Sequence, residues 1–130
     1  MGLKRNILRE IGINYVLNQL TKQGFSYAIQ NIGKNLFIII GVGTPRKRVK
    51  IKASSGFNHI LFDKNHNFNN VDFIMIYVYN ENNPTVYILT IDDVKRYLQE
   101  RYDANGNLLF YWLPVSAYKQ LQFENAWHRL

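Results

Sequence analysis

The stretch from Pro45 to Ala53 alternates cationic and aliphatic residues with the two-residue period of a β-strand. Arg48, Lys50 and Lys52 therefore share one face of the expected strand, and the aliphatic residues between them point into a core. Side chains two residues apart on one face lie roughly 6 to 7 Å from each other, so the three cations repel one another. A sheet keeps such a row either fully solvated or as a site for an anion.

The overall composition favours an anionic partner. The chain of 130 residues contains 16 Lys and Arg against nine Asp and Glu, which gives a formal net charge of +7. Such a charge favours association with phosphates or anionic surfaces, although a basic protein without any bound anion is an equally simple interpretation. The absence of cysteine excludes disulfides, Cys-ligated metal sites and a thiol nucleophile.

The apolar runs 36–42 and 73–78 are shorter than a membrane span, and the N-terminal residues lack the apolar core of a signal peptide. We therefore expect a cytoplasmic protein that does not associate with a membrane.

The pattern of apolar residues and turn signals predicts one α/β domain over residues 1–130. Gly24 is expected to cap the first helix, and Thr90 with Asp93 predicts a capping box. In chain order we expect a helix over 4–23, a meander of three strands over 25–31, 36–42 and 46–53, and a loop with room for a helical turn over 54–70. We then expect paired strands over 71–79 and 85–89, a helix over 90–101, a turn over 103–107, a strand over 108–113 and a helix over 114–123.

Several of these segments together resemble the PD-(D/E)xK, or restriction-endonuclease-like, nuclease superfamily. The resemblance covers most of residues 10–100 and implies a mixed β-sheet flanked by helices. It is carried by Ile11–Val16, Gly24-Phe25, Asn35–Ile38, Val49–Ser54, Val71–Val78 and Pro84–Thr90.

The resemblance also implies which residues would form a nuclease site. Members of the superfamily hold Mg²⁺ with an Asp and a Glu, and a Lys two residues after the Glu lies near the attacked phosphate. The matching positions here are Asn35, Lys50 and Lys52, so only the lysine is retained. A further helical acid of many relatives falls on Ile13, with Glu10 as a displaced substitute. Because hard cations need carboxylate oxygens, we expect no metal, no cofactor and no cleavage.

A domain of this kind that has lost its metal can still bind phosphates. The sequence therefore predicts a catalytically degenerate nuclease-like domain that binds nucleic acid, DNA more than RNA, through its basic strand and the adjoining loop. The predicted contact residues are Arg46, Lys47, Arg48, Lys50, Lys52, Asn58 and His59.

Two other functions stay open at this point. The first is an active Mg²⁺-dependent nuclease that uses Glu10 and Asp63 as relocated acids beside Lys52. The second is a protein-interaction subunit, such as a homodimer, in which the former site is vestigial and aromatic residues face a partner. A lysine row that serves only to keep a sheet solvated is a third, structural interpretation.

Three further groups have structural interpretations. His59, Asp63 and His66 are spaced as zinc ligands could be, but turn signals around them favour an ordinary loop. Asp72 is expected to have a hydrogen-bonded structural role at the start of a strand. Most aromatic side chains are expected in the core, and the segment 123–130 is expected to dock on the domain or on a second subunit.

Overall fold

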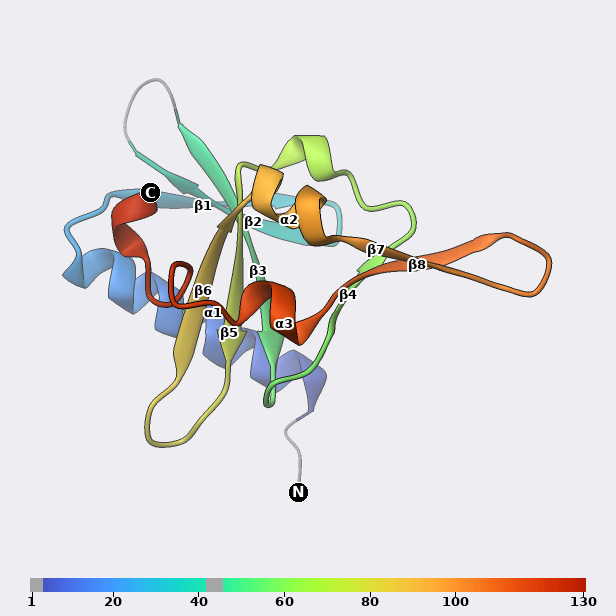
Figure 1. The fold of residues 1–130 in the computed structure, drawn as a ribbon. Coiled ribbons are helices and arrows are strands. Elements are labelled where there is room, and N and C mark those ends of the chain that lie inside the picture. The colour runs from blue at the N-terminus through green and yellow to red at the C-terminus, as the bar shows by residue number, and fades with distance from the viewer. Residues whose placement is uncertain (1–3, 42–45) are drawn as a thin grey trace.

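Helix α1 (Arg5–Lys22) covers one face of a β-sheet in the computed structural model, which describes residues 4–41 and 46–130 (Figure 1). Its buried residues recur every fourth position, at Leu8, Gly12, Val16 and Leu20, so they form one stripe along the helix. A Cβ on Gly12 would lie 3.0 Å from the Tyr77 ring. The absence of a side chain at Gly12 therefore lets the helix lie directly on the sheet.

The main sheet is mixed and has five strands in the order β1-β2-β3-β5-β6. The strands β3 and β5 run parallel, and the other three neighbouring pairs are antiparallel. This architecture confirms the predicted α/β fold, the predicted three-strand meander and the predicted hairpin. The strands are β1 (Tyr27–Ile32), β2 (Asn35–Ile40), β3 (Lys47–Ser54), β5 (Phe73–Val78) and β6 (Thr85–Thr90).

A second, antiparallel sheet has the strand order β4-β8-β7 and lies beside the opposite face of the main sheet (Figure 1). Its strands are β4 (Ile60–Asp63), β7 (Gln99–Tyr102) and β8 (Leu108–Leu113). The β7–β8 hairpin extends away from the body of the molecule, and the chain reverses at its tip through the predicted turn over 103–107.

The segment 54–70 differs from the predicted loop with room for a helical turn because it also contains a strand. It contains β4 and the 3₁₀ helix η1 (Phe68–Asn70). Ile60 and Phe62 are buried while Leu61 and Asp63 are exposed, so β4 alternates as a strand should. This alternation spans only four residues, and pairing with β8, almost 50 residues later, is what stabilises it.

Two predicted helices are shorter than expected. Helix α2 (Ile91–Tyr97) begins with the predicted Thr90–Asp93 capping box but ends early, because 99–102 pairs with β8 as β7. Helix α3 (Val115–Tyr118) ends because the chain beyond it docks against β6, where the Phe123 carbonyl accepts a hydrogen bond from Ile88 N. The chain then enters the 3₁₀ helix η2 (Trp127–Arg129), which confirms that the C-terminal segment docks on the domain.

The core has two layers because both faces of the main sheet are covered. Val49, Met75 and Tyr77 pack beneath α1, whereas Ile74 and Ile76 pack against the second sheet, α2 and α3. Paired residues on neighbouring strands point to the same face, so Lys50 and Lys52 emerge on the side of Ile74 and Ile76. Of the helices that the structure describes, none has the length and apolar character needed to cross a membrane.

Candidate anion-binding site

A cavity of about 410 Å³ opens where β2 separates from β3. The two strands pair over only three residues each, and Ile38 opposite Val49 is the last pair before they diverge. From Lys50 to Ser54, β3 keeps its pairing with β5 on the far side, so its other edge faces the cavity. The lining residues are Arg5, Arg9, Ile13, Lys34, Asn35, Leu36, Lys50, Ile51, Lys52, Ala53, Ser54, His59, Ile60 and Leu61.

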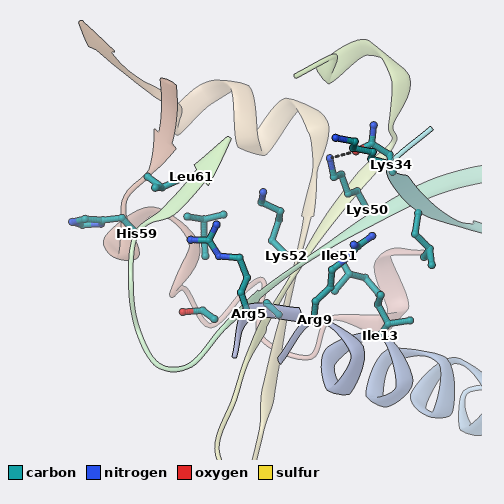
Figure 2. Close-up of a pocket in the computed structure, with 14 residues that line it drawn as sticks. Arg5, Arg9, Ile13, Lys34, Lys50, Ile51, Lys52, His59 and Leu61 are labelled. Atoms are coloured by element: carbon teal, nitrogen blue, oxygen red, sulfur yellow. Dashed lines mark hydrogen bonds between the residues drawn. The ribbon is translucent and has the colours of Figure 1, made fainter. Parts of the chain in front are cut away.

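Five cationic side chains converge on this cavity from three parts of the chain (Figure 2). Arg5 and Arg9 come from successive turns of α1, Lys34 from the β1–β2 turn, and Lys50 and Lys52 from β3. Within residues 4–41 and 46–130, no Asp or Glu lines the cavity. The cavity is therefore a concentration of positive charge that an anion can neutralise.

The two strand lysines make few contacts of their own. Lys50 Nζ donates a hydrogen bond to Asn35 Oδ1 at 3.3 Å, and Lys52 Nζ lies 4.9 Å from the centroid of the Phe62 ring. In the part of the chain that the structure describes, neither ammonium forms a salt bridge. Both side chains therefore keep donors for a bound ligand, since an ammonium carries three N–H groups.

Burial and mutual repulsion weaken the charge of these lysines. Burial lowers the pKa of Lys52 to about 8, and the positive charges of Lys50, Arg5 and Arg9 contribute to the same shift. Burial and the neighbouring Arg9 also lower the pKa of Lys50. A phosphate in the cavity would reverse the repulsive part of these shifts, because it places negative charge among the cations.

His59 lies at the cavity wall in a fixed orientation. Its Nδ1 accepts a hydrogen bond from Val115 N at 3.2 Å, and its ring lies 4.9 Å from the Trp112 ring in an edge contact. Because Nδ1 acts as an acceptor, the proton of the neutral ring is on Nε2, which can donate. His59 is thus a candidate neutral donor beside the five cations.

Arg48 lies outside the cavity, although it shares the strand face of Lys50 and Lys52. Its guanidinium donates to both Asn70 O, at 3.2 Å, and Asn70 Oδ1, and to Gln30 Oε1 at 3.1 Å. It also lies 5.5 Å from the centroid of the Phe37 ring. The Arg48 side chain thus links β3 to β1 and to η1.

The remaining predicted contact residues are also dispersed. Arg46 lines a second cavity with Arg48, and Lys47 points to the opposite face of β3, 5.6 Å from the Phe73 ring centroid. Asn58 donates to Ser54 Oγ and accepts from the Tyr118 hydroxyl, so it stabilises the loop after β3. Of the seven predicted contacts, the cavity brings together Lys50, Lys52 and His59.

The acids of the alternative nuclease hypothesis do not line the cavity. Glu10 is exposed on α1, and Asp63 accepts a hydrogen bond from Asn65 N at the end of β4. Asp72 has the structural role that the sequence predicted, because its carboxylate accepts a hydrogen bond from Arg48 N at 2.8 Å.

His59, Asp63 and His66 do not form a metal site. His66 packs among aromatic rings, 5.2 Å from Phe62 and 4.4 Å from Phe68 between ring centroids. Burial, followed by the charges of Lys50 and Lys52, lowers the pKa of His66 to about 4, so the ring is neutral at pH 7. Across the described ranges, no three His, Asp or Glu side chains are grouped as metal ligands.

Sequence reasoning missed Arg5, Arg9 and Lys34. Arg5 and Arg9 are four residues apart on α1, so they share one face of the helix. Arg9 directly follows the buried residue Leu8, which places this face beside the core-facing one. That spacing was a usable signal for a basic helix edge. No sequence signal showed that this edge would face the diverging ends of β2 and β3.

Comparisons with protein-family models, with curated proteins and with solved structures found no match to this chain.

Proposed function

We propose that the protein is a nuclease-like domain without a metal site that binds the phosphate backbone of nucleic acid in the cation-lined cavity. The observation that carries this proposal is the convergence of five cations, with no acid among the described lining residues. Phosphate groups are the anions that such clusters of Lys and Arg bind most often in nucleic-acid-binding proteins. DNA is the expected target over RNA on the strength of the nuclease resemblance.

The positions of the motif residues support the nuclease-like part of the proposal. Asn35, Lys50 and Lys52, which match the superfamily motif, all line the same cavity, and the first two are joined by a hydrogen bond. An ammonium and a neutral amide thus stand where metal-binding carboxylates would be needed. Mg²⁺ would be repelled by the charge of Lys50, whereas a phosphate oxygen would be attracted by it.

In this proposal, anion binding is driven by the loss of repulsion among the cations that line the cavity. The apo protein keeps like charges together at the cost of a lowered Lys52 pKa. A bound phosphate raises that pKa again, so binding takes up protons at pH values near and above 8. Affinity should therefore fall as the pH rises from 7 to 9, and it should fall steeply with salt because counterions are released on binding.

The test is a fluorescence anisotropy titration of labelled single-stranded DNA, duplex DNA and RNA of 20 nucleotides at several salt concentrations. The double variant Lys50→Ala/Lys52→Ala should weaken binding about tenfold or more at low salt and reduce the salt slope by about two. The matched control Lys22→Ala/Arg96→Ala removes the same charge from exposed positions outside the cavity.

The control should keep most of the wild-type affinity. Equal losses in the two double variants would mean that only net charge matters, and the proposal of a defined site would be wrong. Wild-type protein that binds none of the three nucleic acids at low salt would contradict the proposed function as a whole.

A further inference from the structure

Cations on two sides and an aromatic ring surround the amine of Lys52. Arg5 and Arg9 act on it from α1, Lys50 from its own strand, and the Phe62 ring from β4. Figure 2 shows Lys52 between Arg5 and Lys50, with its amine directed into the cavity. Asp63 is the acid whose charge reaches the amine, and its opposing effect is smaller than those of the cations.

This environment makes Lys52 chemically different from an ordinary surface lysine. A pKa of about 8 leaves about one amine in ten uncharged at pH 7, against about one in three thousand for a lysine at 10.5. Only the uncharged amine has a free electron pair, and lysines become nucleophiles when burial or a neighbouring cation favours that form. In the described residues, no hydrogen-bond acceptor holds the Lys52 amine.

We propose that Lys52 is a nucleophile that captures aldehydes carried on phosphate esters. The neighbouring cations Arg5, Arg9, Lys34 and Lys50 would hold the phosphates while the Lys52 amine meets the carbonyl carbon. Two sources offer this combination, an abasic site in DNA, whose sugar opens to an aldehyde between two phosphates, and a free sugar phosphate. The DNA source rests on the proposed function, whereas the sugar phosphate does not.

The covalent step needs no oxidant and no further reactant. The electron pair of the uncharged amine forms a bond to the carbonyl carbon, and the π electrons of the carbonyl move to its oxygen. A proton passes from nitrogen to that oxygen and gives a carbinolamine. Loss of water with uptake of a proton then yields an iminium ion, which keeps one positive charge on the Lys52 nitrogen.

The experiment traps this imine by reduction. Wild-type protein is incubated with cyanoborohydride and either a 20-nucleotide DNA with one abasic site or glyceraldehyde 3-phosphate, and the modified residue is identified by peptide mass spectrometry. We expect the adduct on Lys52, with a rate that rises with pH through pH 8 and levels off only above it, because the amine is half uncharged at about pH 8 and the bound phosphate raises its pKa. Unmodified DNA of the same sequence should compete in both arms.

Lys52→Arg is the decisive variant because it keeps the positive charge but has no nucleophilic amine at these pH values. It should reduce trapping about twentyfold or more while binding unmodified DNA within about threefold of wild type. Lys22→Ala, which removes an exposed amine of the same helix as Arg5 and Arg9, should trap as wild type does.

The outcomes separate the inference from the proposed function. Trapping of the sugar phosphate on Lys52 without any DNA binding would contradict the proposed function. Lys52 would then be the nucleophile for a free sugar phosphate. Normal DNA binding with no Lys52 adduct in either arm overturns the inference and keeps the function. Labelling spread equally over Lys34, Lys50 and Lys52 also overturns it, because the reactivity would then not belong to Lys52.

Discussion

Arg48 and Lys52 lie on the same face of the same strand, yet the structure treats them in opposite ways. The Arg48 guanidinium donates hydrogen bonds to Asn70 and Gln30 and lies against the Phe37 ring. The Lys52 amine has a ring contact, repulsive neighbours and open space in front of it. A cation whose terminal nitrogens are hydrogen-bonded to protein oxygens serves the fold, whereas a cation left among other cations is available to a ligand.

The point of divergence between β2 and β3 creates this difference. Where the strands pair, Arg48 contacts Gln30 of β1, the Phe37 ring of β2 and Asn70 in the segment before β5. At Lys50 and Lys52, two and four residues after Arg48, β2 no longer pairs with β3. The edge of β3 there faces the cavity instead of a neighbouring strand. The contrast between an enclosed structural cation and an open binding cation can be tested residue by residue.

The largest effect should come from Arg48→Met, which removes the charged hydrogen bonds and leaves the Asn70 and Gln30 oxygens without their donor. We expect the free energy of unfolding to fall by about 3 kcal/mol, as urea denaturation would measure. The DNA affinity of the folded variant should change less than about threefold. Weakened DNA binding at unchanged stability would reverse the roles assigned to the two cations.

Lys52→Met should have the opposite effect on stability. The folded-state pKa of about 8 lies below the usual 10.5, so the unfolded chain binds more protons between these values and wild-type stability rises through this window. Below pH 8 the charged amine costs roughly 2 kcal/mol after allowance for its partial exposure. The methionine variant should therefore be more stable by that amount at pH 7.

Most of the gain from Lys52→Met should be lost at pH 10.5, where the wild-type amine is uncharged in the folded state and about half uncharged in the unfolded chain. Urea denaturation of wild type and variant at the two pH values measures this difference, and the buried tyrosines, which titrate in both proteins, cancel from it. A variant that is less stable than wild type at pH 7 would show that Lys52 is a structural cation like Arg48.

A smaller effect is expected from Arg9→Ala, which tests whether the helix contributes to the site. Removing one phosphate contact should lower the slope of log affinity against log salt by about one. Lys22→Ala on the same helix removes the same charge outside the cavity and should leave the slope close to wild type. Identical slopes for the two variants would restrict the site to the strand lysines.

The smallest effect is expected from Glu10→Gln. Glu10 is exposed on α1 and does not line the cavity, so its loss should change DNA affinity less than about twofold. Plasmid incubated with wild-type protein and Mg²⁺ or Mn²⁺ should stay intact. Cleavage by wild type that disappears in Glu10→Gln or Lys52→Ala would establish the alternative of an active nuclease with relocated acids.

Local sequence signals predicted much of the fold. The alternation in β3, the Thr90–Asp93 capping box and the Gly24 cap are each fixed by residues close together in the chain, and each is present. The strands β4 and β7 were missed because their stability depends on pairing with β8, at a distance in sequence that local patterns do not describe. The predicted length of helix α3 was too great because the chain after Tyr118 docks on β6 instead of continuing the helix.

The site was predictable only in part, for the same physical reason. The period of β3 placed Lys50 and Lys52 on one face, and this is how the structure has them. The same period also grouped Arg48 with them, because alternation specifies a face but not the partners that each side chain meets. The contributions of Arg5, Arg9 and Lys34 depend on how α1 and the β1–β2 turn pack around the divergent strands.

The most direct test of the central claim is a crystal structure of the protein with a short single-stranded DNA. We predict a phosphate in the cavity between α1 and β3, with oxygens about 2.7 to 3.2 Å from the amines of Lys50 and Lys52 and with Arg48 still bound to Asn70. A strand bound at Arg46 and Arg48 with the cavity vacant would contradict the account. A magnesium ion beside Asn35 and Lys50 would contradict it equally.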